Sequence, residues 1–453
     1  MPDPHQLDVA ILGAGITGLP AAWKLKEAGR AVRVFEKNRR IGGPIESYRS
    51  HGFLFEKGPN TIQVDGQDLL DTFNGLGIGD QLIESNPIAN KRYILRDGSP
   101  VALPMSPKSL LTTPAFSWKA KGRILAEPFI PGGDASDESL AETVRRRFGQ
   151  EIVDYAVNSF IAGIYAGSPE EISTRYGFPK IYELEQRHGS LIKGMLRSQK
   201  AKRDSEDTFK TRLISFRDGL ETLPKAIERQ LPNEIELGAH LSQIEHRSGS
   251  WSLKTQSGEY SAKHLLVCLP SSGISALPWP KEIATELTPL KTISHPPVTA
   301  LNLGFARDQI SHPLDGFGLL VPEVEPASIL GVMFNSTLFP GRAENGQVAL
   351  TVFVGGSRQP ELTQLTDSEL ESMVISDLQR FLGLSGSPMF NRRVDWPRAI
   401  PQYDRNFGTI LDTFQSIETS HPGIHFCGHV RDGIALPKCI RAGLNAASRF
   451  QLL

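Results

Sequence analysis

The fold is decided by residues 8–43, which read DVAILGAGITGLPAAWKLKEAGRAVRVFEKNRRIGG. The apolar run 9–12 predicts a buried strand, and the Gly-x-Gly-x-x-Gly behind it predicts a tight turn into a helix. The first glycine of such a turn makes the bend, the second lets backbone N–H groups approach a pyrophosphate, and the third lets the helix pack closely on the strand. The turn consists of Gly13, Ala14, Gly15, Ile16, Thr17 and Gly18.

A second strand and an acid complete the pattern. Residues 32–35 predict a strand that ends at Glu36, eighteen residues after Gly18, where a carboxylate can hold the ribose hydroxyls of an adenosine. Pro20 suits the first turn of the intervening helix, and Gly29 suits its end. A glycine triplet alone would be weak evidence, but a triplet framed by strand, helix, strand and acid predicts a dinucleotide-binding domain.

The choice between dinucleotides depends on Gly42 and Gly43. FAD enzymes of the glutathione reductase type place such a doublet against the pyrophosphate, whereas an NAD-only domain does not need one; the alternative is an ordinary turn. Near the other end, the stretch 423–428 leads through a Gly-containing turn to a helix over 439–450. The start of that helix would point at the flavin edge on which negative charge develops upon reduction. We therefore expect FAD.

Length and composition agree with a flavoprotein of two or three domains. The 453 residues are 39% hydrophobic, and the net charge of −1 does not indicate a nucleic-acid partner. The three cysteines, Cys268, Cys427 and Cys439, lack the spacing of a metal site, so we expect no metal and a reducing compartment. The sequence shows no targeting segment and no apolar run of about 18 residues. These features predict a cytoplasmic protein.

The predicted fold class is α/β (α+β over the whole chain), with a discontinuous Rossmann-type FAD-binding domain. Its three parts are residues 1–86, 213–295 and 393–453. A helical insertion, 87–212, separates the first two parts, and a β-rich substrate domain, 296–392, separates the last two.

Local patterns predict the elements within these parts. Ser136 or Asp137 can cap a helix that runs to residue 148, and residues 151–161 predict a second helix. A capping box at 366–369 begins a helix in the substrate domain. The expected strands are 264–270 in the FAD-binding domain and 298–305, 317–321, 329–335 and 348–354 in the substrate domain.

Two stretches of the insertion raise the question of a membrane surface. The basic stretch 193–212 is expected to be a solvated helix end and loop, with contact to anionic lipid headgroups as the alternative. Residues 109–119 combine apolar and aromatic side chains with basic ones, as an interfacial segment does, although core packing explains them nearly as well. Peripheral contact with the cytoplasmic face of the inner membrane is therefore an open alternative.

Further blocks along the chain carry a family resemblance. They are residues 56–61, 90–94, 160–169, 188–194, 215–223, 316–322, 339–343, 351–358 and 400–403. With them, the sequence closely resembles, essentially end to end, the FAD-dependent and oxygen-dependent protoporphyrinogen oxidases of the haem and chlorophyll pathway, in particular plant and myxobacterial forms. This group lies within the flavin amine oxidase superfamily. The FAD segments are shared with amine oxidases and phytoene desaturases, so the middle blocks are the more specific ones.

The resemblance implies a substrate site. A porphyrinogen is a large apolar macrocycle with ionised propionates at one edge, so it needs an apolar slot with a cation at the rim. By resemblance, Arg92 binds a propionate and Gly163 lets the backbone approach the ring. Leu320 and Met333 are implied as the walls around one pyrrole, and Phe353 as the surface on which another stacks. Without the family blocks, the three walls would be assigned to strand core and the arginine to the surface.

The FAD contacts extend beyond the first turn. The closing segment 428–435 reads GHVRDGIA where many relatives have GNAYxGVG, so the contact at the flavin edge is its least standard part. His429 replaces an asparagine there and has no assigned role. The expected FAD-binding residues are the turn residues Gly13 to Gly18 together with Glu36, Lys37, Gly42, Gly43, Gly58, Pro59, Asn60, Thr61, Leu241, Gly428, Gly433, Ile434, Ala435 and Leu436.

The reaction implied by the resemblance is the oxidation of protoporphyrinogen IX to protoporphyrin IX. A hydride leaves a saturated ring carbon for flavin N5, a proton is lost, and O2 reoxidises the flavin to give H2O2. No acid–base side chain is assigned, so catalysis would rest on positioning the donor C–H over the flavin.

Three alternatives stay open at this point. Bacterial enzymes with the same scaffold oxidise coproporphyrinogen III, whose four propionates would favour a wider, more basic pocket. An amine oxidase or carotenoid desaturase is less compatible with the block 90–92. A flavin-binding scaffold without turnover is the non-enzymatic alternative. Relatives are often dimers and pass their product to a metal chelatase, but the sequence does not decide the oligomeric state.

Overall fold

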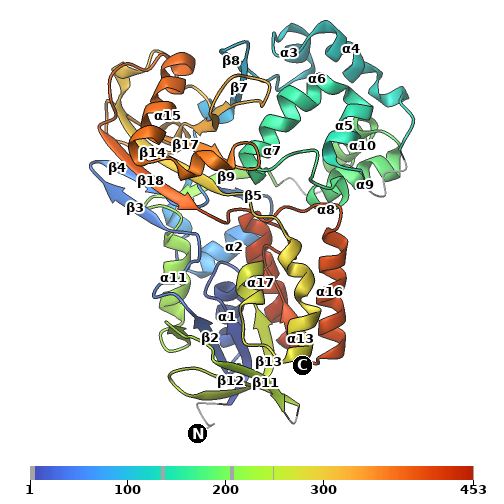
Figure 1. Ribbon diagram of the computed structural model, residues 1–453, viewed down its shortest axis with the longest axis vertical. Coiled ribbons are helices and arrows are strands. Elements are labelled where there is room, and N and C mark those ends of the chain that lie inside the picture. The colour runs from blue at the N-terminus through green and yellow to red at the C-terminus, as the bar shows by residue number, and fades with distance from the viewer. Residues whose placement is uncertain (1–5, 134–137, 205–208, 248, 452–453) are drawn as a thin grey trace.

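The computed structural model describes residues 6–133, 138–204, 209–247 and 249–451 (Figure 1). Two seven-stranded sheets dominate the described chain. In Figure 1 the first sheet lies at the bottom near the chain ends, the second lies at the upper left, and a group of helices lies at the upper right. The mixed α/β architecture expected from the sequence is confirmed.

The first sheet contains the glycine motif. Its strands are β1 (Gln6–Leu12), β2 (Val32–Glu36), β10 (Ile235–Leu237), β11 (Gln243–Arg247), β12 (Ser250–Lys254), β13 (Glu259–Val267) and β19 (Ile424–Phe426). Their order is β10-β2-β1-β13-β12-β11, and β19 also pairs with β13. The β10-β2-β1-β13-β19 pairings are parallel, which confirms the expected parallel strand in β13, although that strand begins earlier than expected and ends at Val267.

Helices cover the parallel part of this sheet. They include α1 (Gly18–Glu27), α2 (Gln67–Gly75), α11 (Thr222–Gln230) and α17 (Leu436–Gln451). Apolar residues of these helices pack with those of β1 and β2 in one continuous core. The helix expected near the C-terminus is confirmed, and it begins one turn earlier than expected, at Leu436.

Two small sheets accompany the two large ones. β3 (Ser47–Ser50) and β4 (Phe53–Glu56) form a hairpin. β9 (Arg212–Phe216) lies between β5 (Ile62–Val64) and β6 (Leu82–Glu84), with antiparallel pairing on both sides. The three-stranded sheet therefore joins chain segments that lie far apart in the sequence.

The second sheet is mostly antiparallel and carries a helix on one face. Its strand order is β18 (Phe390–Trp396), β14 (Val298–Ala306), β17 (Gln347–Gly355), β16 (Ile329–Met333), β15 (Gly318–Leu320), β7 (Tyr93–Arg96) and β8 (Ser99–Ala102). The helix is α15 (Asp367–Leu382), and the Thr366–Glu369 capping box expected at its start is confirmed. Its apolar side chains, among them Leu370, Val374 and Leu378, form a core with one face of the sheet.

Two local expectations differ from the structure of this sheet. The strand expected over 329–335 ends at Met333, because Asn335 begins the short helix α14 (Asn335–Leu338). Residues 93–102, placed by sequence in the helical insertion, form β7 and β8 and extend the sheet. Each strand has only four residues and no alternation of buried and exposed side chains, so the sequence pattern did not indicate them.

The helical group contains α3 (Pro107–Thr112), α4 (Trp118–Ala126), α5 (Leu140–Phe148), α7 (Asn158–Tyr165), α9 (Pro179–His188) and α10 (Leu191–Asp204). Ser139 caps α5 in a capping box with Glu142. The caps expected for this helix, Ser136 and Asp137, lie outside the described residues. The single helix expected over 151–161 is instead α6 (Gln150–Ile152), a π-helical turn and α7.

Candidate functional site

The glycine motif between β1 and α1 leaves open space beside its second glycine. A Cβ atom added at Gly15 would meet no atom within 4 Å. A Cβ at Gly18 would lie 2.1 Å from the Gly13 carbonyl oxygen, so only glycine lets α1 start this close to the strand. Gly43 lies across the same space, because its Cβ would come 3.6 Å from the Gly15 Cα. Both glycine segments therefore border one opening at the positive end of a helix, where an anionic group is favoured.

Glu36 lies at the carboxyl end of β2, beside this turn. Its Oε2 accepts a hydrogen bond from the Ala14 N–H at 2.9 Å, and its Oε1 accepts from the backbone and side chain of Asn38. A carboxylate has about four acceptor sites, so the group can still accept a hydrogen bond from a ligand hydroxyl. The loop that contains Leu241 runs alongside, because the Ala239 N–H donates to the Glu36 carbonyl.

The segment 428–436 joins β19 to α17 and lies against the first motif. Both of its glycines have positive φ, 110° and 115°, which glycine adopts without strain. Asp432 accepts a hydrogen bond from the Gly428 N–H at 2.7 Å and so closes the turn. A Cβ at Gly443 would lie 2.1 Å from the Thr17 carbonyl oxygen, so α17 packs directly against the start of α1. The start of α1 therefore lies against the middle of α17.

The block 58–61 connects this region to the second sheet. A Cβ at Gly58 would lie 2.3 Å from the Pro44 carbonyl oxygen, so the block lies against the loop that follows the glycine doublet. Asn60 donates to the Gly58 carbonyl at 3.2 Å and accepts a hydrogen bond from the Asn335 Nδ2 at 3.0 Å. Since Asn335 begins α14, directly after β16, this hydrogen bond joins the FAD-type region to the second sheet.

The residues expected to bind FAD thus come from several distant segments that the fold brings to neighbouring positions. Lys37, which follows Glu36, is exposed at the rim. The segments are 13–18, 36–37, 42–43, 58–61, 241 and 428–436.

On the second sheet, three strands form a row of paired residues. Leu320 in β15 pairs with Gly331 in β16, and Gly331 pairs with Phe353 in β17. Directly paired residues point to the same face of a sheet, so Leu320 and Phe353 flank a position without a side chain. Met333 lies two residues beyond Gly331 and therefore on the same face. The result is a gap between apolar walls.

A β-bulge shapes this gap. The register of β16 against β17 shifts between Ile329 and Gly331, which leaves Leu330 as the extra residue. Leu330 packs with Phe353 instead of with the core under α15. A Cβ at Gly331 would lie 2.7 Å from the Leu319 carbonyl oxygen, so the gap requires glycine.

Helix α7 covers the row. A Cβ at Gly163 would lie 2.7 Å from the Leu320 Cδ2, so the helix can come this close only without a side chain at that position. Ala162 and Ala166 pack in one cluster with Phe353. The structure therefore brings all four apolar candidates, Gly163, Leu320, Met333 and Phe353, to one face of the sheet.

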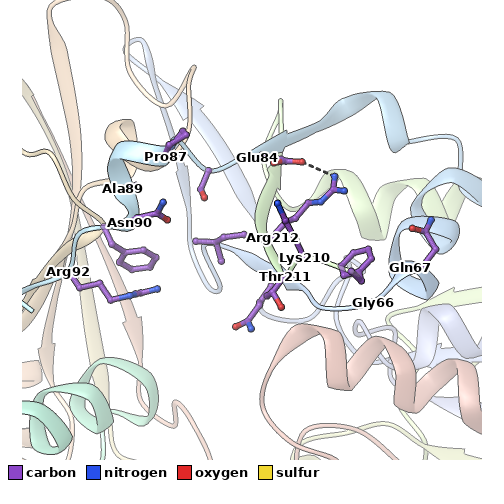
Figure 2. Close-up of a pocket in the computed structure, with 15 residues that line it drawn as sticks. Gly66, Gln67, Glu84, Pro87, Ala89, Asn90, Arg92, Lys210, Thr211 and Arg212 are labelled. Atoms are coloured by element: carbon purple, nitrogen blue, oxygen red, sulfur yellow. Dashed lines mark hydrogen bonds and ion pairs between the residues drawn. The ribbon is translucent and has the colours of Figure 1, made fainter. Parts of the chain in front are cut away.

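Arg92 lies at the edge of this same face. It precedes β7 by one residue, and Ile94 two positions later pairs with Leu320. The guanidinium lies over the Phe317 ring at 4.6 Å from its centroid, and desolvation by the surrounding protein lowers its pKa. Among the described residues it has no ion-pair partner. Figure 2 shows it on one wall of a pocket of about 1110 Å³.

Sequence reasoning missed three residues of this site. A glycine inside the apolar run of β16 indicates a close approach of another group, so Gly331 could have been found from that signal. Phe317 under Arg92 and Asn335 beside Asn60 have no comparable signal, because their roles depend on strand register and on contacts between distant segments.

Comparison with known proteins identifies the family. Residues 16–450 match the family described as flavin containing amine oxidoreductase. The chain belongs to this family. As a flavin-containing oxidoreductase it is an FAD-dependent enzyme, and the open space between its glycine segments fits the extended pyrophosphate of that cofactor.

Individual relatives within the family cover nearly the whole chain. Protoporphyrinogen oxidase 2 of Arabidopsis thaliana is 33% identical, with 98% of this chain and 94% of the relative covered. Coproporphyrinogen III oxidase of Bacillus subtilis is 26% identical, with 97% of both covered. A solved structure from Exiguobacterium sp. 255-15 is 25% identical over 99% of both chains, with a TM-score of 0.81. Reduced UDP-galactopyranose mutase, at 16% identity and a TM-score of 0.75, shares the fold.

Proposed function

We propose that this flavoenzyme oxidises protoporphyrinogen IX to protoporphyrin IX. The proposal rests on the row Leu320–Gly331–Phe353, in which a position without a side chain lies between two apolar side chains. Arg92, which has no ion-pair partner among the described residues, lies at the edge of the same sheet face. A porphyrinogen is complementary to this arrangement, because it has an apolar macrocycle with carboxylates at one edge. The plant protoporphyrinogen oxidase at 33% identity supports the same reading.

The proposed FAD site uses the backbone of the first sheet. Gly15 and Gly43 would border the pyrophosphate, Glu36 would accept hydrogen bonds from the adenosine ribose, and the start of α17 would face the flavin. Once bound, FAD supplies the acceptor for a hydride from the substrate, and O2 is the proposed final acceptor, reduced to H2O2.

The proposed substrate site uses side chains of the second sheet. Leu320 and Met333 would wall one pyrrole, and Phe353 would provide an aromatic surface for another. Arg92 would pair with a propionate, and its stacking on Phe317 holds the guanidinium in place. No side chain is assigned to proton transfer, so these residues act by holding the ring carbon against the flavin.

Coproporphyrinogen III is the second candidate substrate. The Bacillus subtilis coproporphyrinogen III oxidase, at 26% identity over 97% of both chains, is the observation that favours it. The two substrates differ in the number of carboxylates, not in the macrocycle that is oxidised.

The test is anaerobic mixing of the holoenzyme with each porphyrinogen, with the flavin absorbance followed by stopped flow. Fast bleaching with protoporphyrinogen IX, and slow bleaching with coproporphyrinogen III, supports the proposal. Preference for coproporphyrinogen III would transfer the assignment to the second candidate. A flavin that stays oxidised with both would refute the porphyrinogen assignment.

We also propose that the helical group touches a membrane surface. Phe129 and Trp118 are 86% and 75% exposed, and Leu125 and Leu196 nearby are exposed as well. The exposed Lys193 lies over the Phe129 ring at 5.9 Å from its centroid, so a cation borders the apolar surface. Within the described chain no helix is long and apolar enough to cross a bilayer.

Co-sedimentation with anionic liposomes tests this contact. The wild-type enzyme should pellet with the vesicles, and the double variant Trp118→Ser, Phe129→Ser should stay in the supernatant with its flavin retained. Wild-type protein that remains wholly in the supernatant would count against membrane contact.

A further inference from the structure

The pocket beside Arg92 has two walls that come from different regions of the fold. Asn90 and Arg92 line one wall, next to the second sheet, whereas Gly66 and Lys210 line the wall near the three-stranded sheet (Figure 2). Its volume of about 1110 Å³ exceeds what a single carboxylate needs.

The pocket lies next to the row Leu320–Gly331–Phe353 of the substrate site. Phe317 and Leu213 line the pocket, and both also pack in one cluster with Met333. A tetrapyrrole held against Phe353 and Met333 would therefore extend one edge into the pocket, and Arg92 lies where that edge enters.

The charges of the pocket are unbalanced. Three lining side chains are cationic, Arg92, Lys210 and Arg212, and one is a carboxylate, Glu84. Arg212 pairs with Glu84 at 2.9 Å, which accounts for one charge of each sign. Neither Arg92 nor Lys210 has an ion-pair partner within the described ranges. Two cations on opposite walls therefore remain for a ligand.

We infer that this pocket binds the edge of a tetrapyrrole that carries two carboxylates, with Arg92 holding one and Lys210 the other. The inference rests on the proposed function and names a specificity-determining residue within it. Protoporphyrinogen IX has its two propionates on adjacent pyrroles, so both reach the pocket together. Opposed cations can neutralise both carboxylates without bringing either into apolar surroundings.

The apolar gap explains why additional carboxylates are disfavoured. Four apolar residues, Ala162, Ala166, Val298 and Leu330, pack in one cluster with Phe353, and none of them can pair with a charge. Coproporphyrinogen III carries propionates on all of its pyrroles, so its remaining carboxylates would have to enter this gap. A carboxylate that loses water without gaining a partner is strongly destabilised, so the pocket and the gap together select the dicarboxylate.

Equilibrium binding of oxidised porphyrins to the holoenzyme separates this inference from turnover. Protoporphyrin IX and coproporphyrin III are titrated by fluorescence anisotropy against wild type, Arg92→Gln, Lys210→Gln and the double variant. Lys254→Gln is the matched control, because Lys254 is an exposed lysine on β12 of the first sheet, outside the pocket. Lys210 is also exposed, so neither lysine substitution should disturb folding.

Lys210→Gln should weaken protoporphyrin IX binding by about fivefold, as expected for one largely exposed charge pair, and Arg92→Gln should weaken it more. The salt dependence of binding should also become shallower in Lys210→Gln. Unchanged binding in Lys210→Gln, together with weakened binding in Arg92→Gln, would overturn the Lys210 assignment and leave the proposed function intact. Tighter wild-type binding of coproporphyrin III than of protoporphyrin IX would overturn the selection for two carboxylates. The proposed function fails separately, if neither porphyrinogen reduces the flavin.

Discussion

The two sheets build their halves of the site in different ways. The first sheet uses backbone: glycines at the end of β1 and after β2 open a space beside the start of α1. The second sheet uses side chains of one face, together with Gly331, which leaves a position without a side chain between Leu320 and Phe353.

This difference determines how each ligand is recognised and how well each half of the site can be predicted from the sequence. A dinucleotide pyrophosphate is recognised by N–H groups and helix dipoles, which every residue type supplies, so the sequence constraint falls on a few glycines at fixed spacing. An apolar macrocycle is recognised by shape, so the constraint falls on strand register and on which side chains share a face. Substitutions should therefore separate cofactor binding from substrate binding.

The largest effect on FAD binding is expected at the glycines of the first sheet. Two of them should differ in their effect on the stability of the protein. Gly18→Val would push α1 away from the Gly13 carbonyl, since even a Cβ there would lie 2.1 Å from it. We expect loss of bound FAD together with a lower thermal midpoint. A Cβ at Gly15 meets no protein atom within 4 Å, so Gly15→Val should abolish FAD binding without lowering the thermal midpoint of the apoprotein.

The flavin absorbance of the purified proteins and thermal unfolding of their apo forms measure both outcomes. Gly122→Ala is the control, because Gly122 is exposed in α4 and a Cβ there meets nothing within 4 Å. A Gly15→Val enzyme that retains stoichiometric FAD would mean that the open space at this glycine does not hold the pyrophosphate.

The next largest effect is expected at Gly331, where a substitution should impair turnover of the substrate but leave FAD binding unchanged. Gly331→Ala would place a Cβ 2.7 Å from the Leu319 carbonyl and partly fill the gap, so strand β16 must shift. Because a misplacement of about 1 Å can cost 10²-fold in rate, we expect about a 100-fold loss in kcat/KM for protoporphyrinogen IX. The FAD content should match wild type, since the first sheet is unchanged. Simultaneous loss of FAD would show that cofactor binding and substrate binding do not depend separately on the two sheets.

The difference between the two sheets also explains which parts of the site could be predicted from the sequence. Gly13, Gly15 and Gly18 predicted a strand, a turn and a helix that the structure contains, because their spacing and the apolar run before them are local features of the sequence. Gly331 was overlooked although a glycine inside an apolar run is a signal of close approach, and the residues that flank it follow only from the pairing of three strands. No local pattern places Phe317 under Arg92.

Arg92→Ala tests substrate binding at the edge of the face that contains Leu320 and Phe353. A charge-assisted hydrogen bond to a carboxylate contributes about 1.5–3 kcal/mol, so KM for protoporphyrinogen IX should rise about 10- to 100-fold with little change in kcat. Arg92→Lys should recover only part of the loss, since an ammonium cannot bind a carboxylate in bidentate fashion. An unchanged kcat/KM in Arg92→Ala would contradict the role of this residue in substrate binding.

The smallest effect is expected at His429, where the two regions meet. Its carbonyl accepts a hydrogen bond from the Tyr403 hydroxyl, and burial lowers the pKa of its imidazole to about 4. The unfolded chain, with an imidazole pKa near 6.5, therefore binds more protons than the folded one between pH 6.5 and 4. Stability from this group is full above pH 6.5 and is lost as the pH falls towards 4, by about 2 kcal/mol from pH 7 to 5. Thermal unfolding at both pH values should show a smaller acid-induced drop in His429→Asn than in wild type. An equal drop in both proteins would mean that other groups account for the acid sensitivity.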